Sequence, residues 1–119
     1  MTGGRGARRW GPVSEHGEIQ ITCGSDDEAA TIAHLLVERR LAACVQSIPI
    51  GSVYEWDGTI HDDREVLLLV KTRADRFDDV ARLVGELHSY ELPAITMVPI
   101  TGTRAYLDWI DQQVQSPAG

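Results

Sequence analysis

Cys23 and His88 are the strongest candidates for metal chemistry in the sequence. A thiolate and an imidazole together suit copper or zinc. Two donors alone make a weak site, because tetrahedral zinc is held by three or four ligands. Asp26, Asp27 and Glu91 lie close to this pair in the sequence and are candidate oxygen ligands. The same pair also fits a structural interpretation, with a buried cysteine at a strand end and a solvated histidine at a helix C-terminus.

The sequence lacks the common motifs of catalysis. It contains no GxSxG, no HExxH and no Walker-type glycine loop. We therefore expect a protein that is not an enzyme. Tyr54 and Trp56 could stack on a ligand, although packing at an interface is the favoured use of both rings. His16, His34 and His61 are expected to be surface or packing residues.

Composition excludes several classes of partner. The chain has 119 residues and a net charge of −7, and its basic residues are not clustered. A phosphate backbone requires a dense basic face, so we expect no nucleic-acid partner and no binding to anionic membranes. No apolar run approaches the ~20 residues that span a bilayer. The two cysteines are too few for a disulfide-built fold, and the start has no apolar signal region, so we expect a cytoplasmic protein.

The elements that would position these residues follow from hydrophobic periodicity. Alternation predicts a strand over 18–23, and helical spacing predicts a helix over 27–40 with Ser25 or Asp26 as its N-cap. An extended segment over 43–56 contains Pro49 and Gly51, which favour a bulge or bend.

Turn and cap signals predict the remaining elements. Asp57-Gly58 is a strong hairpin signal, followed by a return strand over 60–71. Thr72 and Asp75 resemble a capping box at the start of a helix over 74–88. A fourth strand over 95–100 and a third helix capped by Thr103 complete the set.

This order predicts an α+β fold of the ferredoxin-like, split βαβ type with an antiparallel sheet. Right-handed crossovers place the third strand between the first two, the fourth strand beside the first, and both main helices on one face. Cys23 and His88 then meet at one end of the protomer. Cys44 lies at the far edge near Lys71, too distant from Cys23 for a disulfide. We expect a disordered extension over 1–17, one domain over 18–115 and a flexible tail over 116–119.

The predicted third strand suggests an oligomer. Every position from Val66 to Val70 is apolar, although the helices cover only one face of the sheet. The hairpin arms are also much longer than the first strand, so they overhang the sheet and need a partner surface. The alternative is that the terminal helix or tail covers the open face.

Two segments carry a family resemblance. The run LLVERRLAACVQSIPIGSVYEWDGTIHDDREVLLLVKT, followed by ELHSYELPAITMVPITGTRAYLDWI, resembles the CutA family of divalent-cation tolerance proteins. The resemblance covers about residues 18–111. It implies a ferredoxin-like protomer in an interlocked homotrimer, a role in tolerance to copper and other divalent metals, and a trimer architecture similar to that of P-II-type signalling proteins.

The resemblance also implies functional residues. Copper contacts of the family fall on Cys23 and His88, while Leu87 occupies the position of a preceding histidine. Positions expected to line a cleft between subunits are Tyr54, Trp56, Glu65, Lys71, Tyr90 and Glu91.

The preferred interpretation is a cytoplasmic, non-enzymatic homotrimer that weakly binds copper or another divalent cation. The alternative is a P-II-like trimer that signals or binds a small ligand in the intersubunit cleft. A third reading is an enzyme that uses Lys71, Glu65 and Tyr90 in that cleft.

Overall fold

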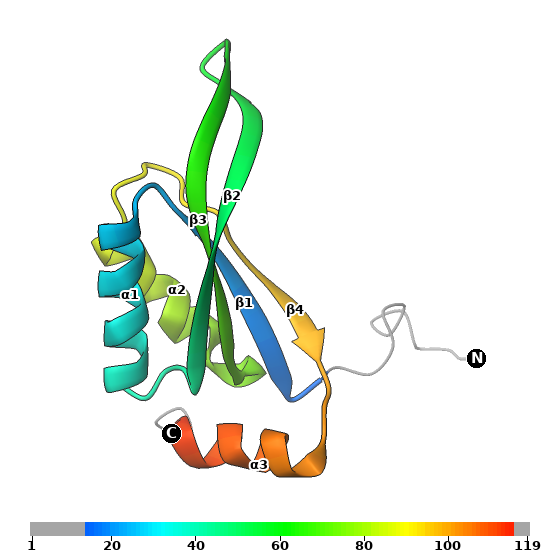
Figure 1. Cartoon of the computed structure of the whole chain (residues 1–119). Helices are drawn as coiled ribbons and strands as arrows, with labels where there is room; N and C mark the ends of the chain where they lie inside the picture. Colours follow the sequence, from blue (N-terminus) through cyan, green and yellow to red (C-terminus); the bar gives the residue numbers. More distant parts are fainter. Residues whose placement is uncertain (1–13, 116–119) are drawn as a thin grey trace, which may run out of the picture.

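The computed structural model describes residues 14–115, which form one sheet with helices on one of its faces and beyond one of its ends (Figure 1). The elements in chain order are β1 (His16–Cys23), α1 (Asp26–Glu38), β2 (Cys44–Trp56), β3 (Thr59–Arg73), the 3₁₀ helix η2 (Ala74–Arg76), α2 (Phe77–Leu87), β4 (Ile95–Ile100) and α3 (Arg104–Gln113). Within this range no helix is both long and apolar enough to cross a membrane.

The four strands form an antiparallel sheet in the order β2-β3-β1-β4. The central strand β1 pairs antiparallel with β3 on one side and with β4 on the other. The edge strand β2 pairs antiparallel with β3. This order confirms the predicted ferredoxin-like, α+β topology, including the placement of the third strand between the first two.

The hydrophobic core lies between the sheet and the two helices α1 and α2, which cover the same face (Figure 1). Successive side chains of β1 point to opposite faces of the sheet, so Ile19, Ile21 and Cys23 all lie on this face, where they are fully buried. Helical spacing in α1 packs Ile32 and Leu36 against them. Each fully buried aliphatic side chain contributes about 1.5–3 kcal/mol. The core therefore fixes the last residue of this row, Cys23, at the end of β1.

The opposite face of the sheet is open in the single chain. Leu67 and Leu69 of β3 are only partly buried there, and Ile48 of β2 is 44% exposed. The terminal helix α3 does not cover this face, because it lies beyond one end of the sheet (Figure 1). There Ile110 and Val114 pack against Ala43. The apolar surface predicted to need a second partner is thus present.

The β2–β3 hairpin projects past the rest of the sheet (Figure 1). Its register is one to one from Cys44↔Lys71 to Trp56↔Thr59, so the bulge predicted near Pro49 is wrong. β2 is an edge strand. Proline is tolerated in an edge strand because the side that has no neighbouring strand needs no backbone N–H donor. The tip at Asp57-Gly58 is confirmed as a two-residue turn, with φ of 55° and 81°.

The start of the domain differs from the prediction by two residues. β1 begins at His16, which pairs with Arg73 and Ile100. The His16 Nε2 atom also lies 2.9 Å from Asp111 Oδ1 on α3, so the histidine is a packing residue, as predicted. The last residues of the predicted 1–17 extension therefore belong to the sheet. Residues 1–13 and 116–119, for which disorder was predicted, lie outside the described residues.

The helix caps were predicted correctly in two cases and wrongly in one. Ser25 and Thr103 accept hydrogen bonds from the backbone N–H groups of Glu28 and Tyr106, as N-caps do. The predicted capping box at Thr72 is wrong, because Thr72 is buried in β3 and donates to the Leu41 carbonyl at 2.6 Å.

Both main helices are shorter than predicted. α2 begins only at Phe77, after η2. α1 ends at Glu38, because Arg40 adopts a left-handed φ of 57° that a helix cannot continue through.

Candidate functional site

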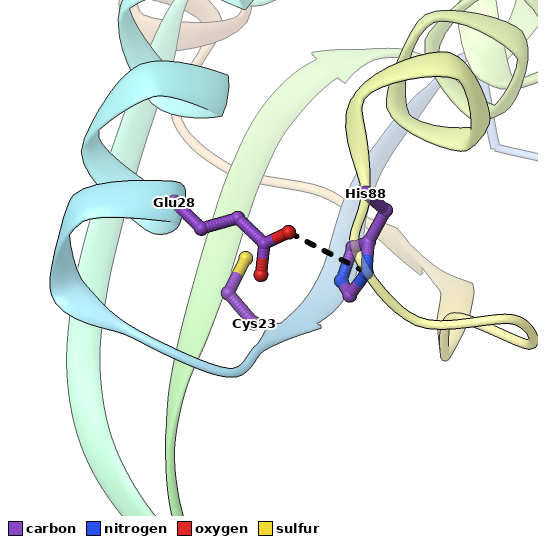
Figure 2. A group of neighbouring side chains, drawn as sticks. All are labelled: Cys23, Glu28 and His88. Carbon is purple, nitrogen blue, oxygen red and sulfur yellow. Dashed lines mark ion pairs between the residues drawn. The ribbon is translucent and has the colours of Figure 1, made fainter.

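Three potential metal ligands meet at one end of the sheet (Figure 2). The Cys23 Sγ atom, a carboxylate oxygen of Glu28 and a ring nitrogen of His88 all lie within 4.8 Å of one another. Cys23 ends β1, Glu28 lies in the first turn of α1, and His88 follows α2. The structure therefore brings together the two residues singled out in the sequence and adds a third.

Glu28 is the residue that sequence reasoning missed. The proposed oxygen ligands Asp26, Asp27 and Glu91 are all exposed and are not in the cluster. One sequence signal could have identified Glu28: it follows Ser25 by three residues, which is the spacing of a capping box. The Glu28 carboxylate reaches back to accept from the Gly24 N–H at 3.2 Å, and its other oxygen accepts from the Ser89 N–H at 2.6 Å. It thereby joins the β1–α1 loop to the segment after α2.

These hydrogen bonds keep the Glu28 carboxylate charged. Burial by itself raises its pKa, but the hydrogen bonds from the Ser89 and Gly24 N–H groups outweigh that effect, and the net pKa lies below the usual value. At neutral pH the cluster therefore contains a carboxylate that already has two backbone donors.

His88 is held in one tautomer. Its Nε2 atom lies 2.7 Å from the Thr22 carbonyl oxygen, so Nε2 carries the proton and donates. Its Nδ1 atom accepts from the Tyr90 N–H at 3.0 Å and lies 3.8 Å from the Glu28 carboxylate. The side chain has 0% exposure, so the interpretation of a solvated histidine is wrong. Nδ1 is the atom available to a metal ion, at the expense of the Tyr90 contact.

Cys23 is a protonated thiol at neutral pH. Burial raises its pKa to about 11, and the nearby charges of Glu28 and Glu65 add to that effect. Such a thiol is a poor nucleophile, because the thiolate is the reactive form. Neither Cys23 nor Cys44 forms a disulfide within the described chain, as predicted.

A second feature lies on the open face of the sheet, along the β2 arm of the hairpin. It is a cleft of about 450 Å³ lined by Thr22, Ser52, Tyr54, Trp56, Glu65, Tyr90, Glu91, Leu92 and Ala94. The Tyr90 hydroxyl donates to the Glu65 carboxylate at 2.6 Å. The Tyr54 hydroxyl donates to Asp63 at 2.6 Å, and its ring stacks on His61. Each hydrogen bond to a carboxylate raises the pKa of its tyrosine, that of Tyr54 to about 12.

Five of the six residues expected in a cleft line this cavity, and Lys71 does not. The Lys71 ammonium instead contacts Glu18 at 3.0 Å and Gln46 at 2.9 Å. Lys71 lies six residues from Glu65 along β3, which corresponds to roughly 20 Å. The combination of Lys71, Glu65 and Tyr90 required by the enzymatic reading is therefore not assembled within one chain.

Comparisons with known proteins agree with one another. The model of the family "CutA1 divalent ion tolerance protein" matches residues 18–113. The divalent-cation tolerance protein CutA of Archaeoglobus fulgidus is 44% identical over 101 residues, which cover 84% of this chain and 99% of that protein. The protein of the same name from Thermus thermophilus is 47% identical over 94 residues, covering 77% of this chain and 91% of that protein.

A solved structure extends the agreement to the fold. The structure of the Archaeoglobus fulgidus protein, described as a periplasmic divalent cation tolerance protein, matches with a TM-score of 0.82 at 44% identity and covers 84% of this chain and 99% of that one. Family model, relatives and solved structure cover nearly the whole of the described domain, and this chain belongs to the CutA1 divalent ion tolerance protein family.

Proposed function

We propose that this chain acts in divalent-cation tolerance by weakly binding copper or another divalent cation at Cys23, Glu28 and His88. The observation that carries the proposal is the approach of their three donor atoms to within 4.8 Å of one another. Thiolate, imidazole and carboxylate together form a donor set that suits copper and zinc. Three protein ligands leave a fourth position of a tetrahedral ion open to water or another ligand.

The same geometry makes binding weak, because each donor already has a partner. The ion must displace the proton of Cys23, whose pKa is raised to about 11. It must also take the Nδ1 lone pair of His88 from the Tyr90 N–H. The Glu28 carboxylate has two backbone donors in place. These costs favour reversible capture of an ion over permanent retention.

The proposed assembly is a homotrimer in the cytoplasm that has no catalytic role. The open sheet face and the projecting hairpin support association, since Leu67 and Leu69 are only partly covered and Val53 near the tip is 72% exposed. Apolar surface of this extent in one protomer favours burial against other copies.

Metal titration tests the proposed site. Calorimetry with copper and zinc under anaerobic conditions should give binding to the native protein and a clear loss in Cys23→Ser, Glu28→Gln and His88→Gln. Matched controls are Cys44→Ser and His34→Gln, which remove the same groups away from the cluster. Loss of binding in the controls, or full affinity in a Cys23→Ser, His88→Gln double variant that melts normally, would reject the site.

A second candidate function is binding of a small ligand in the cleft, as in P-II-like signalling trimers. The cleft of about 450 Å³ favours it, because that volume lies within the range of small-molecule sites. The cleft lining does not include Cys23, Glu28 or His88, so separate variants can test the two functions.

A further inference from the structure

The three candidate ligands are not open to solvent to the same degree. Cys23 and the side chain of His88 are 0% exposed, whereas the side chain of Glu28 is 14% exposed. An ion that arrives from solvent therefore meets Glu28 first. It reaches the Nδ1 atom of His88 only after the group that covers this atom has moved.

Tyr90 is the residue that covers His88. Its N–H donates to His88 Nδ1 at 3.0 Å, and the centroids of the two rings are 4.8 Å apart. The Tyr90 ring also lies against Gly24, the residue after Cys23, where an added Cβ atom would be 2.9 Å from the Tyr90 hydroxyl oxygen. That hydroxyl donates to Glu65 of β3 at 2.6 Å. Tyr90 therefore crosses the end of β1 and is held on both sides of it.

The Tyr90 N–H and a metal ion compete for the same pair of electrons. Nε2 of His88 carries the proton that it donates to the Thr22 carbonyl, so Nδ1 has one lone pair to offer. This lone pair can accept from the N–H or bind an ion, but it cannot do both. A carboxylate differs, because its two oxygens offer about four acceptor positions, and Glu28 can keep its backbone hydrogen bonds when it binds an ion. The contact that must break is therefore the one to Tyr90.

We propose that Tyr90 is a lid over the cluster, and that opening of this lid sets the rate at which a metal ion reaches His88 Nδ1. The hydrogen bond to the Glu65 carboxylate favours the closed position, because a charged acceptor strengthens it. The lid belongs to residues 88–94, which contain no helix or strand. The inference rests on the proposed metal function and concerns its regulation. Every contact that it uses joins atoms of one chain, so it does not depend on which surface other copies cover.

The Cys23 thiol reports opening of the lid without any metal. The residue is fully buried, so its alkylation by iodoacetamide requires the protein to open. In a Cys44→Ser background at alkaline pH, Tyr90→Phe should accelerate alkylation of Cys23 at least about tenfold, the factor for one hydrogen bond to a charged group. Tyr106→Phe removes the hydroxyl of an exposed tyrosine on α3 and should leave the rate unchanged. Dilute urea should change the rate little, because local opening exposes much less surface than global unfolding.

A second variant acts on the lid from the side of β1. Gly24→Ala places a methyl group 2.9 Å from the hydroxyl oxygen of Tyr90 and 3.1 Å from its Cε1 atom, so the ring has to shift. This variant should also accelerate alkylation of Cys23. Gly102→Ala is the matched control, because its new methyl group meets only Leu107, at 3.9 Å, and the rate should stay at the native value.

Zinc connects the lid with the metal site. Uptake of zinc by the full chain, followed by stopped flow with a zinc-sensitive dye, should be faster in Tyr90→Phe and in Gly24→Ala than in the native protein. Bound zinc should also accelerate hydrogen exchange of the native Tyr90 N–H, which loses its acceptor. The His88 N–H donates to the Val84 carbonyl at 2.8 Å, and its exchange should not change.

Failure of the lid and failure of the metal site give different results. Zinc that binds at the native rate in both variants would overturn the proposal and leave the metal site in place, and native alkylation rates in both variants would do the same. Continued protection of the Tyr90 N–H with zinc bound would also overturn it, since Nδ1 would then not be a ligand. If the native protein binds no zinc, the metal function fails and the proposal fails with it, even where alkylation is accelerated.

Discussion

The Nε2 atom of His88 lies 2.7 Å from the carbonyl oxygen of Thr22 and fastens the segment after α2 to the end of β1. This contact spans 66 positions of sequence, so the histidine closes the fold at the end where the candidate ligands gather. A buried imidazole with both nitrogens engaged is a structural element in its own right, whatever else it binds.

The first prediction follows from that contact. His88→Phe keeps a ring of similar size but leaves the Thr22 carbonyl and the Tyr90 N–H without their partner. The free energy of unfolding should fall by roughly 1–3 kcal/mol, the cost of buried polar groups left unpaired. His34→Phe on the exposed side of α1 is the control and should change stability by no more than about 0.5 kcal/mol. Urea denaturation measures both, and equal stabilities would contradict the structural role.

The second prediction concerns pH and Cys23. The thiol keeps its proton to about pH 11 in the native state and loses it near 9.0 in the unfolded chain. The native state binds more protons in that window, so the free energy of unfolding should fall as pH rises from about 9 to about 11. This part of the fall should vanish in Cys23→Ala and persist in Cys44→Ala. Urea unfolding at several pH values gives the comparison, and parallel curves for the native protein and Cys23→Ala would refute it.

The third prediction concerns Glu28 at low pH. Its pKa is lowered in the native state, so its contribution is present above the unfolded value of 4.5 and is lost as pH falls through the native pKa. Glu28→Gln should destabilise the protein at pH 7 by roughly 1–2 kcal/mol and reduce the loss of stability on acidification. Asp27→Asn removes the same charge from the same helical turn without these hydrogen bonds. If the two variants behave alike, only the helix dipole is involved.

The fourth prediction concerns assembly. Sedimentation should give a species of three protomers and no folded monomer at ordinary concentrations. Trp56 is 46% exposed in the single chain, so Trp56→Ala should weaken association more than it weakens the protomer itself. Truncation of a tryptophan that is buried in an assembly costs about 3–5 kcal/mol. A stable, soluble monomer of the native chain would be incompatible with this expectation.

Much of the fold could be predicted because its signals are local. Ser25 and Thr103 are adjacent to the helix ends they cap, and Asp57-Gly58 determines its own turn. Thr72 shows the limit of such signals. A threonine followed three residues later by an acid occurs both at helix starts and at strand ends. The local pattern does not reveal that Thr72 is buried and donates a hydrogen bond to the Leu41 carbonyl, 31 residues away in sequence.

The candidate site was only partly predictable because it depends on long-range contacts. Topology was enough to bring Cys23 and His88 to the same end. The position of Glu28 depends on Ser89, which is 61 residues away in sequence. Lys71 was grouped with Glu65 and Tyr90 by resemblance alone, whereas the register of β3 places it opposite Cys44 at the other end of the sheet.

Tyr90 uses its two ends in different places, since its N–H donates to His88 Nδ1 and its hydroxyl donates to Glu65. A metal ion that takes the Nδ1 lone pair takes it from the Tyr90 N–H, and a ligand in the cleft lies beside the hydroxyl of the same residue. The cluster at Cys23 and the cleft therefore share one residue, whose backbone faces the first and whose side chain lines the second. If occupancy of one place moves Tyr90, linkage requires each ligand to change the affinity for the other by the same factor. A protein with that coupling would register a bound metal ion as a change in ligand affinity, which is the behaviour of a sensor more than that of a store.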